Sequence, residues 1–311
     1  MRELTVNVAI TARNAEGNIK PMIRSILKQV EKSYTLKRII VNSDDSTDNM
    51  VKVARQIKDP RVHVRDSRVR RGFAGAVIDV LAMNDADVMM VMADDVAILD
   101  KLFIEKTITP FLKEKNVGLV CSNHMPFSSG NMVQRAVTSS FNAYHKIRVK
   151  YRNGVNVHTC DGKSLTMSKT FIKTLKFPKD LSEMACTDWY VYFKCIKNGF
   201  AYRFAENAKT YYKNPATIKD YVQWTTRNNV DIIMMQEQFS KIFDEHYNFP
   251  RIPFMYYKAI EFIKNPLGCL LLFGMSIYCT IKAKSKNTKK FETAWDAVIS
   301  TKGKIVIPSK L

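Results

Sequence analysis

The sequence predicts an α/β protein in which a mostly parallel sheet is flanked by helices. Short apolar runs alternate with segments of helical spacing through the first hundred residues. Such alternation is typical of parallel strands that are covered by helices on both faces. A polar cluster follows each of the apolar runs, and ligands of such sheets collect at the carboxyl ends of the strands. We therefore expect the functional residues at these strand ends.

The elements of this sheet follow one another in order. The first helix has Pro21 in its opening turn, where proline is tolerated, and the second begins with hydroxyl and Asp capping candidates. The third helix is rich in small residues that permit close packing on a sheet. Strands are predicted at 4–11, 36–43, 59–67 and 86–95, and helices at 18–30, 46–57 and 72–85.

The pattern is looser between Phe127 and Asp180, where a strand and a short helix precede Pro178. Residues 186–200 are predicted to form a helix that starts at a Thr–Asp pair and closes at Gly199. A further helix, rich in aromatic and Met residues, is expected at 219–239.

Composition narrows the possible partners. The 311-residue chain is 46% hydrophobic and 25% charged, which is ordinary for a globular protein, but its formal net charge is +20. This charge favours an anionic partner: nucleic acid, a phospholipid surface or a phosphate-bearing substrate. The six cysteines include no CxxC pair and suit buried positions in a reducing, cytosolic environment, and we expect no signal peptide.

The composition changes after Phe249. An apolar run from Leu267 to Ile281 is shorter than the roughly 20 residues of a spanning helix, and a basic cluster at 282–290 follows it. A tilted or partial insertion, an in-plane anchor and a buried core helix are all open, and the basic cluster favours the cytoplasmic face of a membrane. We expect a catalytic domain at 1–245 and membrane-associating helices with a basic tail at 246–311.

Four polar blocks follow the predicted strands: "TARNAEGNI", "NSDDSTD", "RRGFAGA" and "MADDV". In this order, over roughly the first 240 residues, the chain resembles the family-2 glycosyltransferases, which have the nucleotide-sugar-binding GT-A fold. The resemblance implies a GT-A domain that binds a nucleotide-diphosphate sugar.

The resemblance also implies the donor-binding residues. Thr11 to Arg13 would form the wall that faces the base, and Asn14 and Glu16 keep two positions of a family turn whose Pro is missing. Asp44 would contact the base or the ribose, because a carboxylate accepts hydrogen bonds from an imide or a hydroxyl. Arg71 and Gly72 would approach the diphosphate.

The two adjacent carboxylates of "MADDV" occupy the place of the family's metal-binding Asp-x-Asp motif, although Met92 or Ala93 replaces its first Asp. Asp95 is the leading predicted ligand of Mn²⁺ or Mg²⁺, and Asp94 is expected to bind through water or to contact the donor sugar. The alternative is a polar turn that only ends the strand.

The family places its catalytic base in a Glu-Asp or Thr-Asp pair at the start of a helix, and this position falls on Asp188. A carboxylate there would take the proton from the acceptor hydroxyl in an inverting transfer. The alternative is a helix N-cap, since Thr187 and Asp188 are both good caps.

Weaker candidates follow from other segments. Trp224 and Arg227 resemble, with shifted spacing, a Gln-x-x-Arg-Trp helix of membrane-associated family members. Arg227 would pair with the diphosphate and Trp224 would stack on the acceptor. The alternative is that Trp224 is a core residue and Arg227 lies on a solvated helix face. His158 and Asp161 would line the acceptor side, although a lone His is more often structural.

Together these features predict a membrane-associated glycosyltransferase on the cytoplasmic face. It would transfer a sugar from a nucleotide-diphosphate donor to a glycan or lipid-linked acceptor, on a hydroxyl or a lipid phosphate, in polysaccharide or glycolipid biosynthesis. One alternative is a catalytically inactive relative that serves as a membrane scaffold. Another is a basic nucleic-acid-binding protein, which the scattered Lys and Arg residues disfavour.

Overall fold

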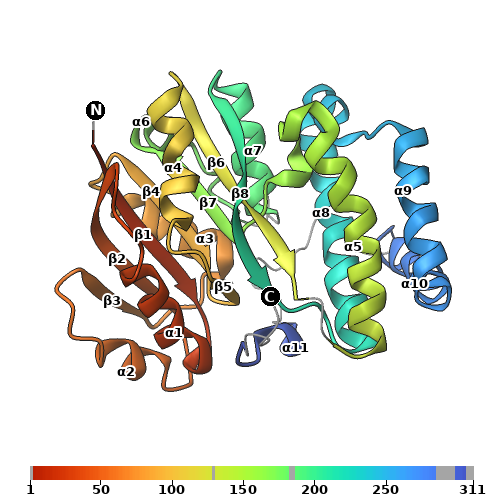
Figure 1. The fold of residues 1–311 in the computed structure, drawn as a ribbon. Coiled ribbons are helices and arrows are strands. Elements are labelled where there is room, and N and C mark those ends of the chain that lie inside the picture. The colour runs from red at the N-terminus through yellow and green to blue at the C-terminus, as the bar shows by residue number, and fades with distance from the viewer. Residues whose placement is uncertain (1–2, 128–129, 182–185, 285–297, 306–311) are drawn as a thin grey trace. The chain divides into compact units, whose positions relative to one another are not determined.

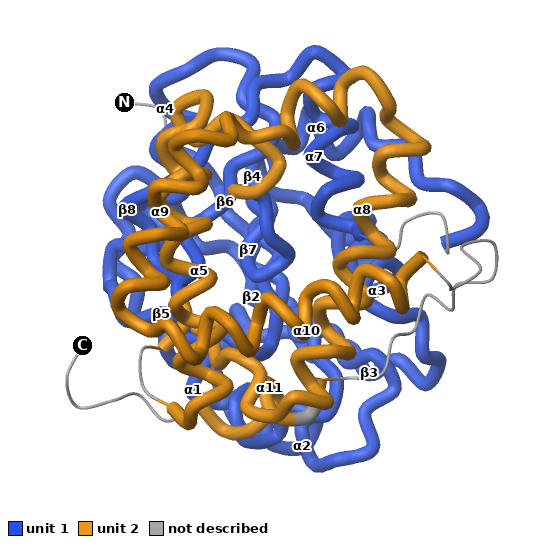
Figure 2. Tube along the Cα trace, turned by 90° about the vertical axis from the view of Figure 1, so that its right-hand side faces the viewer, with its two compact units in different colours: residues 1–125, 160–211, 292–295 blue, residues 126–159, 212–291, 296–311 orange. Residues whose placement is uncertain are grey.

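The structure is a computed structural model that describes residues 3–127, 130–181, 186–284 and 298–305. The chain divides into two compact units (Figure 2). Unit 1 comprises Met1–Met125, Cys160–Tyr211 and Glu292–Trp295, and unit 2 comprises Pro126–Thr159, Tyr212–Phe291 and Asp296–Leu311. The expected boundary between residues 245 and 246 falls inside unit 2 and stays a prediction.

Unit 1 is built on a mixed sheet with the strand order β3-β2-β1-β4-β7-β6-β8-β5 (Figure 1). Strands β1 to β4 pair in parallel, whereas β7 runs antiparallel to β4 and β6. The predicted α/β class with a mostly parallel sheet is therefore confirmed. The strands are β1 (Leu4–Ala12), β2 (Tyr34–Asp44), β3 (Val62–Ser67), β4 (Val88–Ala93), β5 (Val96–Ile98), β6 (Val117–Pro126), β7 (Ser164–Ser168) and β8 (Ala201–Tyr212).

The helices of unit 1 cover this sheet with apolar faces. In α1, Ile19, Ile23 and Ile26 recur at helical spacing and are fully buried. The central strands bury nearly every side chain, as expected for a sheet covered on both faces. The helices are α1 (Glu16–Leu27), α2 (Met50–Arg55), α3 (Gly72–Ala82), α4 (Phe103–Lys113), α6 (Lys169–Thr174) and α7 (Thr187–Lys197).

The strand register brings distant loops to one edge of the sheet. Thr11 of β1 lies opposite Ala93 of β4, and Ala12 lies opposite Ser43 of β2. Met92 lies opposite Ser164, the first residue of the antiparallel β7. The loops after β1, β2 and β4 and the loop before β7 therefore lie along the same edge.

Unit 2 is helical. Where the sequence predicted a loose pattern, the structure has the 19-residue helix α5, whose start is fixed by a capping box between Asn131 and Gln134. Helix α5 packs against α9 and α10, and α10 also packs against α8. The elements are α5 (Met132–Lys150), the 3₁₀ turns η1 (Tyr151–Gly154) and η2 (Val157–Thr159), α8 (Ile218–Tyr247), α9 (Arg251–Lys264), α10 (Pro266–Lys284) and α11 (Ile299–Lys302).

Gly118 on β6 tests the packing of unit 1. A Cβ atom there would lie 2.6 Å from Cβ of Phe200 and 3.1 Å from Cγ of Phe171. We therefore expect Gly118→Ala to lower the free energy of unfolding by about 1–3 kcal/mol through overpacking, as measured by urea denaturation. Gly274→Ala is the matched control, because the methyl group that alanine adds there has open space within 4 Å and alanine favours a helix. Equal stability of the two variants would contradict the predicted packing at Gly118.

Candidate active site

Three carboxylates mark the shared edge of the unit 1 sheet, and each accepts hydrogen bonds from the backbone of another loop. Asp44 ends β2, Asp94 follows β4, and Asp188 lies in the first turn of α7. Their partners are 26 to 81 residues away along the chain. The loops at this edge are therefore joined through acidic side chains.

Asp44 holds the turn that begins α3. Its Oδ1 accepts the Arg71 N–H at 2.7 Å and its Oδ2 accepts the Gly72 N–H at 2.9 Å, and the side chain is buried. Gly72 has a φ of +69°, a conformation that disfavours a side chain. A carboxylate at a helix N-terminus also interacts favourably with the helix dipole. Asp44, which is expected to contact the base or the ribose, thus fixes the turn of Arg71 and Gly72, which is expected to approach the diphosphate.

Asp94 and Asp95 form the turn between β4 and β5. Asp94 is almost completely buried, and its Oδ2 accepts the Arg13 N–H at 2.9 Å, which connects this turn to the loop after β1. Asp95 is partly exposed. On β1, the Thr11 hydroxyl donates to the carbonyl of Met92 at 3.3 Å, so the predicted base-facing wall and the predicted metal site lie next to each other.

The carboxylates of this turn, Asp94 and Asp95, fit a cation site that is completed by substrate phosphates and water. In the parts of the chain that the structure describes, no group of three or more His, Cys, Asp or Glu side chains is arranged to hold a metal ion. Mg²⁺ commonly binds through one or two carboxylates together with substrate phosphates and water. Asp95 and Asp94 supply the carboxylate part of such a set.

Asn14 and Glu16 connect the loops after β1 and β2. The Asn14 side-chain oxygen accepts the Thr47 N–H at 2.8 Å, and Glu16 accepts the Asn49 N–H at 3.2 Å. In return, Asp48 accepts the Glu16 N–H at 2.8 Å. Because these bonds occupy residues 46–49, α2 starts at Met50 rather than at the predicted residue 46. Both side chains thus have a structural role at the edge of the site.

Asp188 is held on both oxygens. Its Oδ2 accepts the Gly162 N–H at 2.7 Å, and its Oδ1 accepts the Trp189 N–H at 3.1 Å and faces Cys186 Sγ at 3.1 Å. The N-cap residue of α7 is Cys186, and the Asp188 carboxylate bonds both to a first-turn N–H of its own helix and to the loop before β7. Burial, and then the nearby Asp161, raise the pKa of Asp188.

Asp161 lies beside Asp188 and has two basic neighbours of its own. Its Oδ2 is 3.2 Å from Nε2 of the buried His124, and its Oδ1 is 3.2 Å from Nζ of Lys163. His124 was not a predicted site residue, because it lies far earlier in the chain, on the mostly buried strand β6, with no motif around it. Only the tertiary structure brings it to this edge.

Phe73 connects the turn of Arg71 and Gly72 with the loop that holds the predicted catalytic base, Asp188. A Cβ atom on Gly162 would lie 3.1 Å from two ring atoms of Phe73, so the α3 N-terminus and the loop before β7 are in contact. Asp44 holds Arg71 and Gly72, and Gly162 donates to Asp188. The predicted donor and catalytic residues of unit 1 therefore form a continuous series of contacts.

Three weaker candidates belong to unit 2. Trp224 packs against the core cluster of Ala136, Val137, Tyr221 and Leu272, and Arg227 is half-buried on α8. The His158 Nδ1 bonds to the Tyr144 hydroxyl and its Nε2 to the Tyr247 carbonyl at 2.6 Å. Burial lowers the pKa of His158 to about 3, which supports the structural alternative, and its place on the acceptor side stays a prediction.

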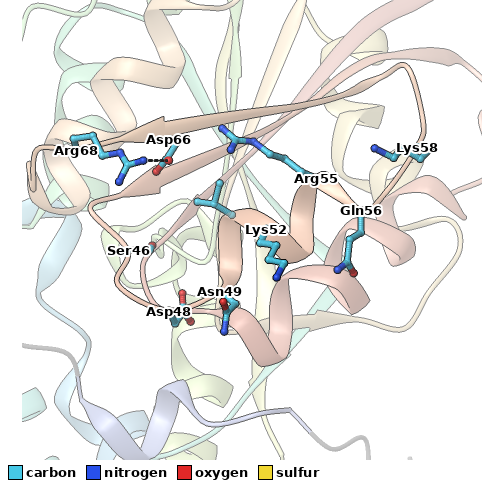
Figure 3. A pocket seen from close by; sticks show the side chains of 10 residues that line it. Ser46, Asp48, Asn49, Lys52, Arg55, Gln56, Lys58, Asp66 and Arg68 are labelled. Carbon is cyan, nitrogen blue, oxygen red and sulfur yellow. Dashed lines mark ion pairs between the residues drawn. The ribbon is translucent and has the colours of Figure 1, made fainter.

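A surface depression of unit 1 lies elsewhere, along α2 and β3 (Figure 3). Its basic side chains spread in different directions, and one of them, Arg68, pairs with Asp66 at 3.2 Å. None of the three carboxylates of the sheet edge lines it. The lining residues are Ser46, Asp48, Asn49, Val51, Lys52, Arg55, Gln56, Lys58, Asp66 and Arg68.

Two solved structures of similar fold were determined with a nucleotide sugar and Mn²⁺. A mannosyltransferase from Pyrobaculum calidifontis, solved with GDP-mannose and Mn²⁺, aligns with a TM-score of 0.58 at 14% identity over 92% of this chain and 77% of its own. Glucosyl-3-phosphoglycerate synthase from Mycobacterium tuberculosis, solved with Mn²⁺, UDP-glucose and phosphoglyceric acid, aligns with a TM-score of 0.53 at 19% identity over 76% of this chain and 79% of its own. These similarities establish the GT-A fold.

Sequence comparison identifies the family. The chain is 25% identical over 201 residues to an Escherichia coli UDP-glucose:α-D-GlcNAc-diphosphoundecaprenol β-1,3-glucosyltransferase, and the match covers 64% of this chain and 72% of the relative. The profile of "Glycosyl transferase family 2" matches residues 7–175, which include most of β1, the strands β2 to β7, and the residues Asp44, Asp94 and Asp95. The chain is therefore a glycosyltransferase that belongs to family 2.

Proposed function

We propose that this protein transfers a sugar, with inversion and with a divalent metal, from a nucleotide-diphosphate donor to an acceptor hydroxyl or lipid phosphate. The observation that carries the proposal is the single sheet edge that holds Asp44, Asp94, Asp95 and Asp188. Solved relatives of the same fold bind GDP-mannose or UDP-glucose with Mn²⁺, which supports a nucleotide-sugar donor.

The donor is proposed to lie across the loops after β1 and β2. Asp44 holds the backbone of Arg71 and Gly72 so that the N-terminus of the 11-residue helix α3 is oriented toward this edge. A helix N-terminus favours negative charge, and the glycine lets the diphosphate approach the backbone. Thr11 and Arg13 are proposed to line the base, and Arg227 to pair with the diphosphate.

Asp95 is the proposed direct ligand of Mn²⁺ or Mg²⁺, and Asp94 the proposed supporting carboxylate. The bound cation would neutralise charge on the departing nucleoside diphosphate. Arg13 keeps Asp94 oriented through its backbone N–H, and Asp94 in turn keeps the β1 loop beside the metal ligands. Asp94 thus positions the loop, and both carboxylates are proposed to position the donor.

Asp188 is the proposed general base. The acceptor O–H would give its proton to the carboxylate while the acceptor oxygen forms a bond to the anomeric carbon, and the bond from that carbon to the diphosphate oxygen breaks. The hydrogen bonds from Gly162 and Trp189 keep the carboxylate in place for this transfer. Asp161 raises the affinity of Asp188 for a proton through its negative charge.

The acceptor is proposed to be glycan or lipid-linked. The Escherichia coli relative acts, by its name, on a diphosphoundecaprenol-linked sugar. One described helix of this chain, Pro266–Lys284, is long and apolar enough to cross a membrane by length and composition, with a mean hydropathy of 1.5. We therefore propose association with the cytoplasmic face of a membrane.

Metal-dependent donor binding tests the role of Asp95. In a thermal-shift screen of nucleoside diphosphates and their sugars, we expect Mn²⁺-dependent stabilisation of the wild type and none of Asp95→Ala. A ligand at about 100-fold above its Kd stabilises by about 2.7 kcal/mol, a readily measured shift. Asp59→Ala, which removes a surface partner of Arg61, is the control and should behave as wild type. An equal shift in wild type and Asp95→Ala would remove Asp95 from the metal site.

Asp188→Asn tests the base. We expect it to retain donor binding in the same thermal-shift assay and to lower the turnover by about 10²–10⁴-fold, because the amide cannot accept the proton. The readout is the release of nucleoside diphosphate in the presence of acceptor. Turnover close to wild type would show that another group accepts the proton. Absence of transfer with every donor, in the wild type, would favour the inactive scaffold.

Asp161→Asn tests the electrostatic coupling at the site. The charge of Asp161 raises the pKa of Asp188, so its removal should lower that pKa. Because the base must be deprotonated, the acidic limb of the pH–turnover profile should move to lower pH in the variant. His124 and Lys163, which flank Asp161, remain in both proteins. A limb that stays in place or moves to higher pH would contradict the coupling.

A further inference from the structure

The outer surface of α9 and α10 is apolar in a regular pattern. On α9 the exposed apolar side chains recur three or four residues apart, and Ile252 is 84% exposed. Helix α10 repeats the pattern, and Leu267 is 76% exposed. This outer face comprises Ile252, Met255, Tyr256, Phe262 and Ile263 on α9 and Leu267, Leu270, Phe273, Ile277, Tyr278 and Ile281 on α10. Water contact with so many large apolar groups on neighbouring helices is costly and indicates an interaction surface.

The opposite side of α10 is packed inside unit 2. Gly268, Leu272, Cys279 and Ala283 are buried at helical spacing, and α10 contacts α5 and α8. Both views show α9 and α10 on the same side of the unit 2 bundle (Figures 1 and 2). The two outer faces therefore belong to one surface of this unit.

This packing argues against a spanning helix. If α10 crossed a bilayer, its neighbours would enter the hydrocarbon with it, and α8 carries Asp220, Arg227 and Asp231 while α5 carries Arg135 and Lys146. Charged side chains at that depth are expensive. A helix that lies in the interface buries its apolar outer face and leaves its polar neighbours in water.

The charges on the two helices point to an anionic partner. Glu261 is the one acidic residue in the sequences of α9 and α10, and it is buried and paired with Lys146 and Lys264. The exposed charges that these two helices contribute are therefore all positive: Arg251, Lys258, Lys264, Lys282 and Lys284. Tyr256 and Tyr278 are exposed among them, and tyrosine favours the membrane–water interface.

We propose that the outer face of α9 and α10 docks in the plane of an anionic phospholipid bilayer, with its apolar side chains at the acyl–headgroup boundary and its lysines among the headgroups. In this arrangement both helices lie flat on the bilayer and neither crosses it. This attachment is peripheral and does not depend on sugar transfer, so it stands apart from the proposed catalysis.

Vesicle cosedimentation of the full chain tests the proposal. We expect binding to phosphatidylglycerol-containing vesicles, weaker binding to pure phosphatidylcholine, and release by alkaline carbonate. Ile263→Glu combined with Phe273→Glu should weaken the binding by at least about tenfold, because two charges would enter the apolar boundary. Met132→Glu is the matched control, since Met132 is an exposed apolar residue of unit 2 on α5, and it should bind as wild type. Circular dichroism establishes that each variant is folded.

A second variant separates the contribution of the lysine charges to vesicle binding from that of the apolar outer face. Lys258→Gln, Lys282→Gln and Lys284→Gln together keep the apolar outer face and should abolish the preference for phosphatidylglycerol. Retention on vesicles of both kinds after alkaline carbonate would overturn the proposal in favour of a spanning helix. No vesicle binding, with a dimer in analytical ultracentrifugation that Ile263→Glu and Phe273→Glu dissociate, would overturn it in favour of a second copy of the chain. Donor binding in the thermal-shift assay is unaffected by either result, so failure here is distinct from failure of the proposed catalysis.

Discussion

The site depends on one kind of interaction: a carboxylate that accepts a backbone N–H from a distant loop. Asp44 holds the start of α3, Asp94 holds the loop after β1, and Asp188 holds the loop before β7. A hydrogen bond to a charged group is worth about 1.5–3 kcal/mol, roughly twice a neutral one. Such bonds at one sheet edge keep the loops in a defined arrangement.

In the proposed function, these carboxylates combine structural and chemical roles. A side chain that binds a donor or accepts a proton must be oriented before the substrate arrives, since preorganised groups need no reorganisation during the reaction. Here the orientation comes from main-chain donors, which are less variable than side chains. The consequence for mutagenesis is that alanine removes the loop contacts along with the charge, whereas asparagine removes the charge and keeps one acceptor oxygen.

The positively charged residues of the chain have different neighbours at the sheet edge and on α9 and α10. At the sheet edge, Arg71 pairs with Asp79, and Lys163 pairs with Asp161, so cations are held near the acidic groups. On α9 and α10 the exposed cations lie beside a regular apolar face, and these helices expose no acidic residue. The net charge of +20 is thus compatible with an anionic substrate and an anionic surface at separate locations.

Local patterns in the sequence were sufficient for the α/β class, the order of strands and helices through residue 95, and the candidate carboxylates, because apolar periodicity and strand-end polarity depend on neighbouring residues. The polar helix α5 was not predicted. Its capping box between Asn131 and Gln134 is a local signal, but its packing on α9 and α10 joins segments that are far apart in the chain. The pairing of Asp161 with His124, the contact between Phe73 and Gly162, and the buried position of His158 join segments that are far apart in the chain. Only the tertiary structure decides such contacts, because they depend on strand order and register, which no local pattern encodes.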